Sequence, residues 1–298
     1  MQKTLSEFVA IVGKPNVGKS SLLNAMIEEK LAIISEKPQT TRNRITGVYT
    51  KDELQIVFID TPGLHKPKTK LGEYMVKQVE SSVAEVDAAV LVVDVTAKEV
   101  SEADKELISS FQSMHLPAVL AINKIDTVQD KAKILEKIMQ YKNLYDFAAI
   151  VPVSAVRKEG VKELREEIRR FAKEGPHFFD GDSYTDQPER VIAAEIIREK
   201  LLRNLYDEIP HGTAVIIESM KERPNSGLLD IHATIYCEKA SHKGMIIGRG
   251  GQMLKKIASQ SRAELENFLG IRVNLQCWVK VREDWRSNEN SIRSFGYI

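Results

Sequence analysis

A glycine-rich turn near the N-terminus carries the first residues whose types and spacing could do chemistry. Residues 13–20 read G-x-x-x-x-G-K-S, between an apolar run at 8–12 and a helix-like segment at 21–26. The glycines let successive backbone N–H groups point into one concavity, and a helix N-terminus adds partial positive charge there. Lys19 can reach outer phosphates, and the Ser20 hydroxyl can bind the magnesium ion that accompanies them. The turn predicts a polyphosphate site made by Gly13, Lys14, Pro15, Asn16, Val17, Gly18, Lys19, Ser20 and Ser21.

A second pattern, D-x-x-G, ends the apolar run at 54–59 and consists of Asp60, Thr61, Pro62 and Gly63. An acidic residue at the carboxyl end of a strand beside a phosphate loop can hold magnesium through water. The N–H group of Gly63 can come close to a terminal phosphate. The pattern alone is common, but its place after a phosphate loop and at a strand end predicts that Asp60 completes the magnesium site with Ser20.

A third pattern indicates which base the site binds. The apolar run at 117–122 leads into Asn123, Lys124 and Asp126, and a later run at 148–153 leads into Ser154 and Ala155. A carboxylate at Asp126 can accept from the ring N–H and the exocyclic amino group of guanine, whereas adenine would leave it unpaired. Backbone N–H groups at Ser154 and Ala155 could reach the guanine carbonyl. These residues predict a guanine nucleotide.

The elements that position these patterns have the order of a nucleotide-binding α/β sheet, with each pattern at a strand's carboxyl end. Near-continuous apolar runs at 88–95 and 117–122 indicate strands buried on both faces, as in a parallel sheet covered by helices. Helical spacing of apolar residues predicts helices at 101–114 and 161–171. We expect an α/β domain over residues 1–174.

The rest of the chain predicts a linker and a smaller domain. Residues 175–189 are rich in Gly, Pro, Asp and aromatics and break both periodicities. Residues 190–283 follow an α-β-β-α-α-β order that begins with an amphipathic helix, and residues 284–298 form a C-terminal tail. Trp278 and Trp285 are each expected in the core rather than as a base-stacking platform.

Residues 246–257 resemble the signature of K-homology RNA-binding modules, with a G-x-x-G loop at 248–251. A loop without bulky side chains lets a nucleic-acid backbone approach closely. Between positions 239 and 282 nine basic residues face two acidic ones, a local charge of +7 in a chain of net charge +1. This favours RNA over the alternative of a plain helix–helix turn. The expected RNA contacts are Ile246, Ile247, Gly248, Arg249, Gly250, Gly251, Leu254, Lys255 and Lys256.

Composition limits the remaining possibilities. The 298 residues suggest two domains, and the apolar (43%) and charged (29%) fractions are typical of globular proteins. The two cysteines, Cys237 and Cys277, lack metal-ligand spacing and are expected to be buried thiols in a reducing compartment. We find neither a signal-peptide pattern nor an apolar stretch long enough to span a bilayer. The expected location is the cytoplasm, or the periphery of a membrane.

Together these motifs resemble translation-factor-type GTPases, and residues 38–42 (P-Q-T-T-R) with D-T-P-G are similar to the Era family in particular. The order of GTPase, linker and RNA module is similar to that family over essentially the whole chain. The resemblance implies an α/β P-loop GTPase domain followed by an α+β type II K-homology domain. It implies GTP and GDP as ligands, Mg²⁺ as cofactor, and the 3′ end of small-subunit ribosomal RNA and the small ribosomal subunit as partners.

The resemblance also implies residue roles. Thr41, with Thr40 as the alternative, is the expected switch threonine that binds magnesium in the GTP state. The expected catalytic residues are Lys19, Thr41 and Gly63, and the expected magnesium ligands are Ser20, Thr41 and Asp60. Leu64 stands where signalling GTPases have a water-orienting glutamine, so intrinsic hydrolysis is expected to be slow. Asn16 implies that a potassium ion could replace an arginine finger. His65 is expected to be a solvated loop residue rather than a general base.

Two other functions stay open at this point. The basic domain could dock on an anionic membrane or a protein partner instead of RNA. Alternatively, the first domain could bind nucleotide without meaningful turnover beside an RNA-tethering module. The expected oligomeric state is a monomer.

Overall fold

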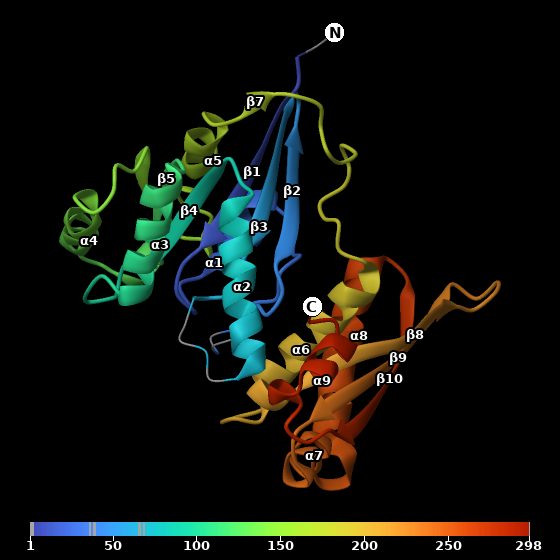
Figure 1. The fold of residues 1–298 in the computed structure, drawn as a ribbon. Coiled ribbons are helices and arrows are strands. Elements are labelled where there is room, and N and C mark those ends of the chain that lie inside the picture. Colours follow the sequence, from blue (N-terminus) through green and yellow to red (C-terminus); the bar gives the residue numbers. More distant parts are fainter. Residues whose placement is uncertain (1–2, 36, 38–39, 65–66, 68, 298) are drawn as a thin grey trace. The chain divides into compact units, whose positions relative to one another are not determined.

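The computed structural model describes residues 3–35, 37, 40–64, 67 and 69–297. The chain forms two compact units, Met1–Pro67 with Gly72–Asp186, and Lys68–Leu71 with Gln187–Ile298 (Figure 1). We describe each unit by itself.

The first unit is a sheet covered by helices on both faces (Figure 1). Its strands are β1 (Leu5–Val12), β2 (Ile45–Lys51), β3 (Leu54–Asp60), β4 (Ala88–Asp94), β5 (Ala118–Asn123), β6 (Ala149–Pro152) and β7 (Lys173–Glu174). The order is β2-β3-β1-β4-β5-β6, with β7 paired to β1. Only β2 and β7 pair antiparallel among these strands. The predicted, mostly parallel α/β sheet is therefore confirmed.

The helices of this unit are α1 (Lys19–Ile27), α2 (Lys70–Ala84), α3 (Glu102–Met114), α4 (Ala132–Lys142) and α5 (Val161–Arg169), with the 3₁₀ turn η1 (Ile125–Thr127). Side chains of α2, α3 and α4 join one core cluster with β1, β4 and β5. Helices α1 and α5 contact each other and also contact strands of the sheet. All seven residues of β3 are buried, as expected for a strand covered on both faces.

The segment predicted as a linker packs on the first unit for much of its length. The amide oxygen of Gln55 accepts from the backbone N–H groups of Phe178 and Phe179, at 2.7 and 3.0 Å. The Phe178 ring lies 4.7 Å from that of Phe8, and the Tyr184 carbonyl accepts from the Val48 N–H at 2.9 Å. Hydrogen bonds to a buried glutamine thus hold this segment against β1, β2 and β3.

The second unit follows the predicted α-β-β-α-α-β order. Its elements are α6 (Glu189–Asn204), η2 (Pro210–Gly212), β8 (Ala214–Glu222), β9 (Leu228–Cys237), α7 (Ala240–Ile247), η3 (Arg249–Gly251), α8 (Gln252–Leu269), β10 (Arg272–Val281), η4 (Trp285–Ser287) and α9 (Glu289–Ser294). The sheet order is β10-β9-β8, with β9 and β10 parallel and β8 and β9 antiparallel. Helix α6 packs on β8 and α8, and α8 packs on β10.

The two tryptophans have opposite environments. Trp285 is fully buried, and its indole N–H donates to the Gly212 carbonyl at 2.9 Å. Trp278 is 45% exposed, so the prediction that it belongs to the core is wrong. It lies on the face of β10 opposite Val279, which is buried, because successive side chains alternate across a strand. Cys237 is buried as predicted, whereas Cys277 is only partly buried.

Helix α6 departs from the simple amphipathic pattern. Ile197, Leu201 and Leu205 are buried as the apolar stripe requires, but Arg198 and Glu199 are buried as well. Arg198 is paired with Glu195, and Lys200 forms an ion pair with Glu264 of α8. Neighbours on more than one side therefore cover this helix. No described helix is long and apolar enough to cross a bilayer.

A buried acid in β1 gives a prediction about stability. Glu7 has no exposed surface, and neither of its carboxyl oxygens has a hydrogen-bond partner among the described residues. Burial, with a smaller contribution from Asp87, raises the pKa of Glu7 to about 8. Its protonated form is thus favoured by folding, so its contribution to stability is full below pH 4.5 and is lost as the pH rises through 8.

We expect Glu7→Gln to remove this pH dependence. At pH 8 the variant should have a free energy of unfolding about 3 kcal/mol above that of the parent chain, and at pH 5 the two should nearly coincide. Urea unfolding at pH 5, 6.5 and 8 measures this. Glu106→Gln, on an exposed position of α3, is the matched control. Parallel pH profiles for the parent chain and Glu7→Gln would contradict the assignment.

Candidate nucleotide site and RNA-binding loop

The phosphate loop has glycines where no other residue fits. Gly13 has φ +145°, and a Cβ there would lie 2.4 Å from the Val92 carbonyl oxygen. Gly18 has φ +95°, and its Cβ would lie 2.3 Å from the amide nitrogen of Asn123. Gly18 is also the N-cap of α1 and provides no side-chain cap, so the first N–H groups of α1 are left for a ligand.

Lys19 crosses the mouth of this loop. Its ammonium group donates to the carbonyl oxygens of Gly13 and Lys14, at 3.1 and 2.9 Å. Burial lowers the pKa of Lys19 to about 8, against the opposing effect of Asp60 and Asp104. The ammonium group is therefore poorly solvated and close to where outer phosphates would bind.

Three oxygen-bearing side chains from separate segments meet beside Lys19. The Ser20 hydroxyl lies 2.7 Å from Oδ2 of Asp60 and 2.8 Å from the Thr41 hydroxyl. The Thr41 hydroxyl lies 3.4 Å from the same Asp60 oxygen. The other oxygen of Asp60 is buried without a hydrogen-bond partner in the described part of the chain, and burial raises the pKa of Asp60 to about 6. A hard, oxygen-preferring cation such as Mg²⁺ fits this set of donors.

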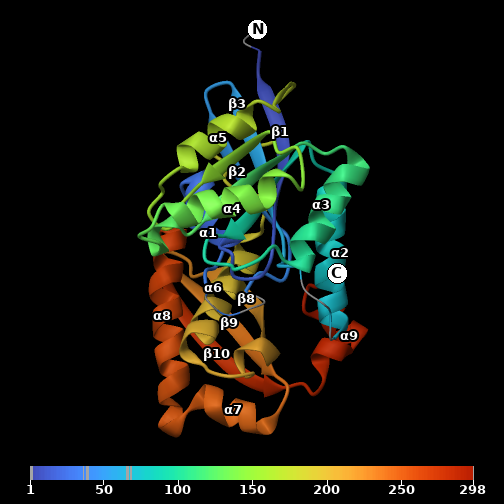
Figure 2. The same cartoon turned by 90° about the vertical axis from the view of Figure 1, so that its left-hand side faces the viewer.

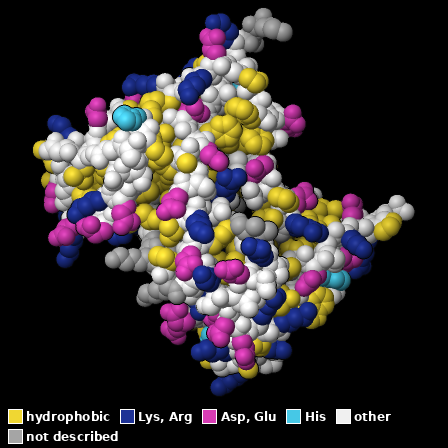
Figure 3. Space-filling model, in the orientation of Figure 1, with side chains coloured by type: hydrophobic (Ala, Val, Ile, Leu, Met, Phe, Trp, Pro, Cys, Tyr) yellow, Lys and Arg dark blue, Asp and Glu magenta, His cyan; other side chains and the backbone are white. Residues whose placement is uncertain are grey.

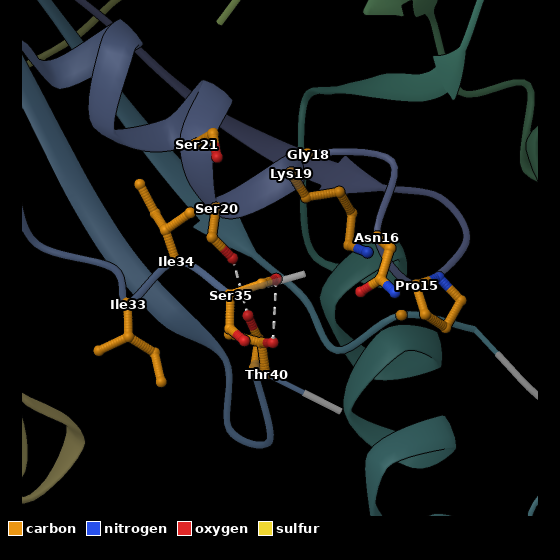
Figure 4. Close-up of a pocket in the computed structure, with 12 residues that line it drawn as sticks. Pro15, Asn16, Gly18, Lys19, Ser20, Ser21, Ile33, Ile34, Ser35 and Thr40 are labelled. Atoms are coloured by element: carbon orange, nitrogen blue, oxygen red, sulfur yellow. Dashed lines mark hydrogen bonds between the residues drawn. The ribbon is translucent and has the colours of Figure 1, made fainter. Parts of the chain in front are cut away.

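The two candidate switch threonines point to different partners. Thr40 donates to the carbonyl oxygen of Lys37 at 2.6 Å, whereas Thr41 contacts Ser20 and Asp60. Figure 4 shows Ser20 pointing toward the segment that carries Ser35 and Thr40, while Lys19 extends beside Asn16. Pro38, Gln39 and His65, on which part of the sequence argument rested, lie outside the described residues.

The D-x-x-G segment lies directly against the phosphate loop. A Cβ on Gly63 would come within 2.6 Å of the backbone of Pro15, so only glycine permits this approach. The Leu64 N–H donates to the Gly13 carbonyl at 3.3 Å, and its side chain packs against the core cluster of the sheet. Thr61 is anchored through its hydroxyl to the Ile11 carbonyl at 3.0 Å, and Pro62 is buried.

The predicted base-binding residues also meet. The Asn123 amide donates to the Val17 carbonyl at 2.9 Å and accepts from the Ala155 N–H at 3.1 Å, which joins three loops. The Ser154 hydroxyl donates to Asp126 at 2.6 Å. Lys124 forms a 2.7 Å ion pair with Asp94, a residue that the sequence argument missed. The position of Asp94 at the carboxyl end of β4 is the sequence feature that could have indicated its place in the site.

The glycine loop of the second unit joins α7 to α8. Gly248, Gly250 and Gly251 all have positive φ. A Cβ on Gly248 would come within 2.7 Å of the Met253 side chain, whereas Gly250 and Gly251 have open space around the missing Cβ. Gly251 caps α8 without a side-chain hydrogen bond, as Gly18 caps α1.

The side chains around this loop differ in accessibility. Arg249, Lys255 and Lys256 are exposed. Ile247 and Leu254 are partly buried and border the loop, but Ile246 has no exposed surface. The expectation that Ile246 contacts RNA is therefore wrong, because its side chain is turned into the core.

The base-binding geometry yields a prediction. Asp126→Asn replaces one acceptor oxygen with a donor NH₂, so guanine nucleotides should bind at least about tenfold more weakly. Xanthine nucleotides, which have a carbonyl where guanine has its amino group, should bind better than in the parent chain. Titration with fluorescent GDP and XDP measures both. Asp130→Asn, on an exposed loop residue, is the control, and an equal loss for both nucleotides would contradict the role of Asp126.

Comparisons with known proteins agree with this two-part architecture. Residues 8–124 match the family model described as 50S ribosome-binding GTPase, and residues 208–286 match that of the KH domain. GTPase Era of Ruminiclostridium cellulolyticum is 50% identical over 98% of this chain and 97% of its own length. GTPase Era of Clostridioides difficile is 49% identical over 98% of both.

Two solved structures are similar along the whole length. A variant of Aquifex aeolicus Era bound to GDP and AlF₄⁻ is 39% identical with a TM-score of 0.94, and the similarity covers 99% of each chain. Era in complex with MgGDPNP and nucleotides 1506–1542 of 16S ribosomal RNA is 39% identical with a TM-score of 0.93, again over 99% of each chain. With its phosphate loop, base-binding loops and glycine loop in place, this chain belongs to the Era family of GTPases.

Proposed function

We propose that this protein hydrolyses GTP with Mg²⁺ and binds the 3′ end of small-subunit ribosomal RNA during maturation of that subunit. The observation that carries the nucleotide part is the convergence of Ser20, Thr41 and Asp60 beside Lys19. The RNA part rests on the open glycine loop with its exposed cations and on a relative that was solved with 16S ribosomal RNA.

Separate groups of residues bind the metal, the phosphates and the base in this proposal. Ser20 and Thr41 would hold the metal directly, and Asp60 would hold it directly or through water. When bound, Mg²⁺ neutralises charge that develops on the phosphate oxygens. Lys19 would bind the outer phosphates, the N–H groups at the start of α1 would orient them, and the Gly63 N–H would sense the γ-phosphate. The base is bound by Asn123, Lys124, Asp126, Ser154 and Ala155.

Intrinsic hydrolysis is proposed to be slow. Leu64 cannot hydrogen-bond water, and its side chain packs on the core. We propose that potassium, held with the help of Asn16, supplies the missing positive charge. Asn16 is exposed and has a left-handed backbone at φ +66° in the loop. Hydrolysis at equal rates in sodium and potassium buffers would remove this part of the proposal.

We further propose that the nucleotide state controls RNA binding. Thr41, Gly63 and Leu64 all contact the phosphate loop, so a γ-phosphate can fix these segments in a way that GDP cannot. The protein is proposed to act as a monomer in the cytoplasm. Peripheral binding to an anionic membrane through the basic domain is the alternative to be tested.

Because Thr40 and Thr41 contact different groups, their alanine variants form a matched pair. Thr41→Ala should weaken binding of a non-hydrolysable GTP analogue, and slow single-turnover hydrolysis, by about tenfold or more while sparing GDP. Thr40→Ala should change both by less than about threefold, because its hydroxyl donates to the Lys37 carbonyl instead. Similar losses in the two variants would contradict the assignment of Thr41.

Titration with RNA tests the proposed function as a whole. A short single-stranded RNA with the small-subunit 3′ sequence should bind about tenfold tighter with the GTP analogue than with GDP. Arg249→Asp combined with Gly250→Asp should abolish binding. Gly250 has φ +57° and open space, which Asp tolerates, so the fold should persist. Equal affinity in both nucleotide states would remove the coupling. Binding to anionic vesicles but not to RNA would favour the membrane alternative.

A further inference from the structure

The three-stranded sheet of the second unit has one face that helices cover only in part. On β10 the residues Arg272, Gln276, Trp278 and Lys280 share this outer face, opposite the inner face that carries the buried Val273 and Val279. Helix α8 packs on β10, and Figure 2 shows α8 and α9 on opposite sides of the sheet. We call the face turned away from α8 the outer sheet face.

The C-terminal tail covers one end of the outer sheet face and leaves the other end open. Phe295, which follows α9, lies 4.7 Å ring to ring from Tyr236 near the end of β9. Two positions back along β9, Thr234 pairs with Trp278 in the sheet. Trp278 is nevertheless 45% exposed, so the tail does not cover its indole ring.

Trp278 is held in place without being buried. Its ring lies 5.3 Å from that of His232 on the neighbouring strand, at an interplanar angle of 82°. An edge-to-face contact of this kind orients an aromatic ring while leaving ring surface free. An oriented, half-exposed aromatic side chain on an open sheet is typical of a surface that binds a partner.

The charges on the outer sheet face indicate the kind of partner. Lys221, Arg272 and Lys280 are exposed on the same face, and none forms an ion pair with a described residue. In the sheet, Asp230 of β9 lies opposite Lys221 of β8 and Asn274 of β10. Its carboxylate accepts hydrogen bonds from Arg223 at 2.5 and 2.7 Å and from the Asn274 side chain at 2.7 Å. These hydrogen bonds lower the pKa of Asp230 to about 2, and Arg223 balances its charge. Figure 3 shows Lys and Arg side chains beside hydrophobic and His side chains over these strands, with Asp and Glu side chains among them.

A partner protein would be matched less well than nucleic acid. The cores of protein interfaces are depleted of lysine and of charge generally, whereas the outer sheet face carries Lys221, Arg272 and Lys280 without ion pairs to described residues. Single-stranded nucleic acids instead combine planar bases, which stack on aromatic rings, with a phosphate at every step. The outer sheet face offers both kinds of contact.

We propose that the outer sheet face is a second RNA-binding surface, on which Trp278 stacks a base, Lys280 contacts the neighbouring phosphate, and Lys221 and Arg272 contact phosphates further along the RNA. The proposal rests on the proposed RNA binding and deepens it. The glycine loop joins α7 to α8, and α8 packs on the inner face of the sheet, so the two surfaces belong to different sides of the unit. A K-homology groove clamps about four nucleotides, and this face would bind nucleotides beyond them.

The test compares two single-stranded RNAs from the small-subunit 3′ sequence, of about four and about fourteen nucleotides, bound to the full chain with a GTP analogue. Trp278→Ala should weaken binding of the longer RNA about tenfold and leave the shorter one unchanged. Trp278→Phe, which keeps a ring, should retain most of the affinity. Tyr206→Ala removes another exposed aromatic residue of this unit and is the control.

Intrinsic fluorescence gives a second readout without a substitution. The chain has two tryptophans, and Trp285 is fully buried, so a stacked base should quench the emission of Trp278. We expect quenching by the longer RNA and not by the shorter one. Tight binding of the longer RNA without quenching, or with Trp278→Ala equal to the parent chain, overturns this proposal and leaves the proposed function intact. Failure of the parent chain to bind either RNA overturns both.

Discussion

The buried carboxylate of Asp60 is the constraint around which the nucleotide site is arranged. It is fully buried at the end of β3, beside Ile11 of β1, so the strand that ends in Asp60 runs parallel to the strand that enters the phosphate loop. A buried carboxylate needs hydrogen bonds or a cation. Ser20 and Thr41 supply hydroxyls, Lys19 supplies the nearby positive charge, and one oxygen is left for a metal ion. The need to stabilise the buried carboxylate of Asp60 therefore brings together three segments that are separate in the chain.

Asn123 has a comparable role on the base side of the site. Its amide group bridges Val17 of the phosphate loop and Ala155 of the last βα loop, and its amide nitrogen lies where a Cβ on Gly18 would be. The side chain therefore fixes the spacing between phosphate and base pockets before any ligand binds. Such preorganisation reduces the ordering that binding would otherwise require.

The two units share a local feature that suits phosphate. Helices α1 and α8 both begin after a glycine in the left-handed region, and neither has a side-chain cap. An uncapped N-terminus leaves backbone donors and a partial positive charge free for an anion. The difference lies in the surroundings. The first helix start is enclosed by Lys19, Asp60 and Gly63, whereas the second opens to solvent beside Arg249 and so suits a polymer that passes along the surface.

The sequence by itself predicted the residues of the candidate nucleotide site, the mostly parallel sheet of the first unit, the α-β-β-α-α-β order of the second and the glycine loop. These features are local, because glycines, strand ends and helix starts impose their geometry within a few residues. Only the tertiary structure decided which side chains are covered. It turned Ile246 into the core, left Trp278 exposed, buried the charged side of α6 and joined Phe178 and Phe179 to Gln55. Periodicity shows that an element has two faces, but which face is covered depends on packing by distant segments such as α8 and the C-terminal tail. In the same way, only the folded chain shows that Thr41 rather than Thr40 lies beside Asp60.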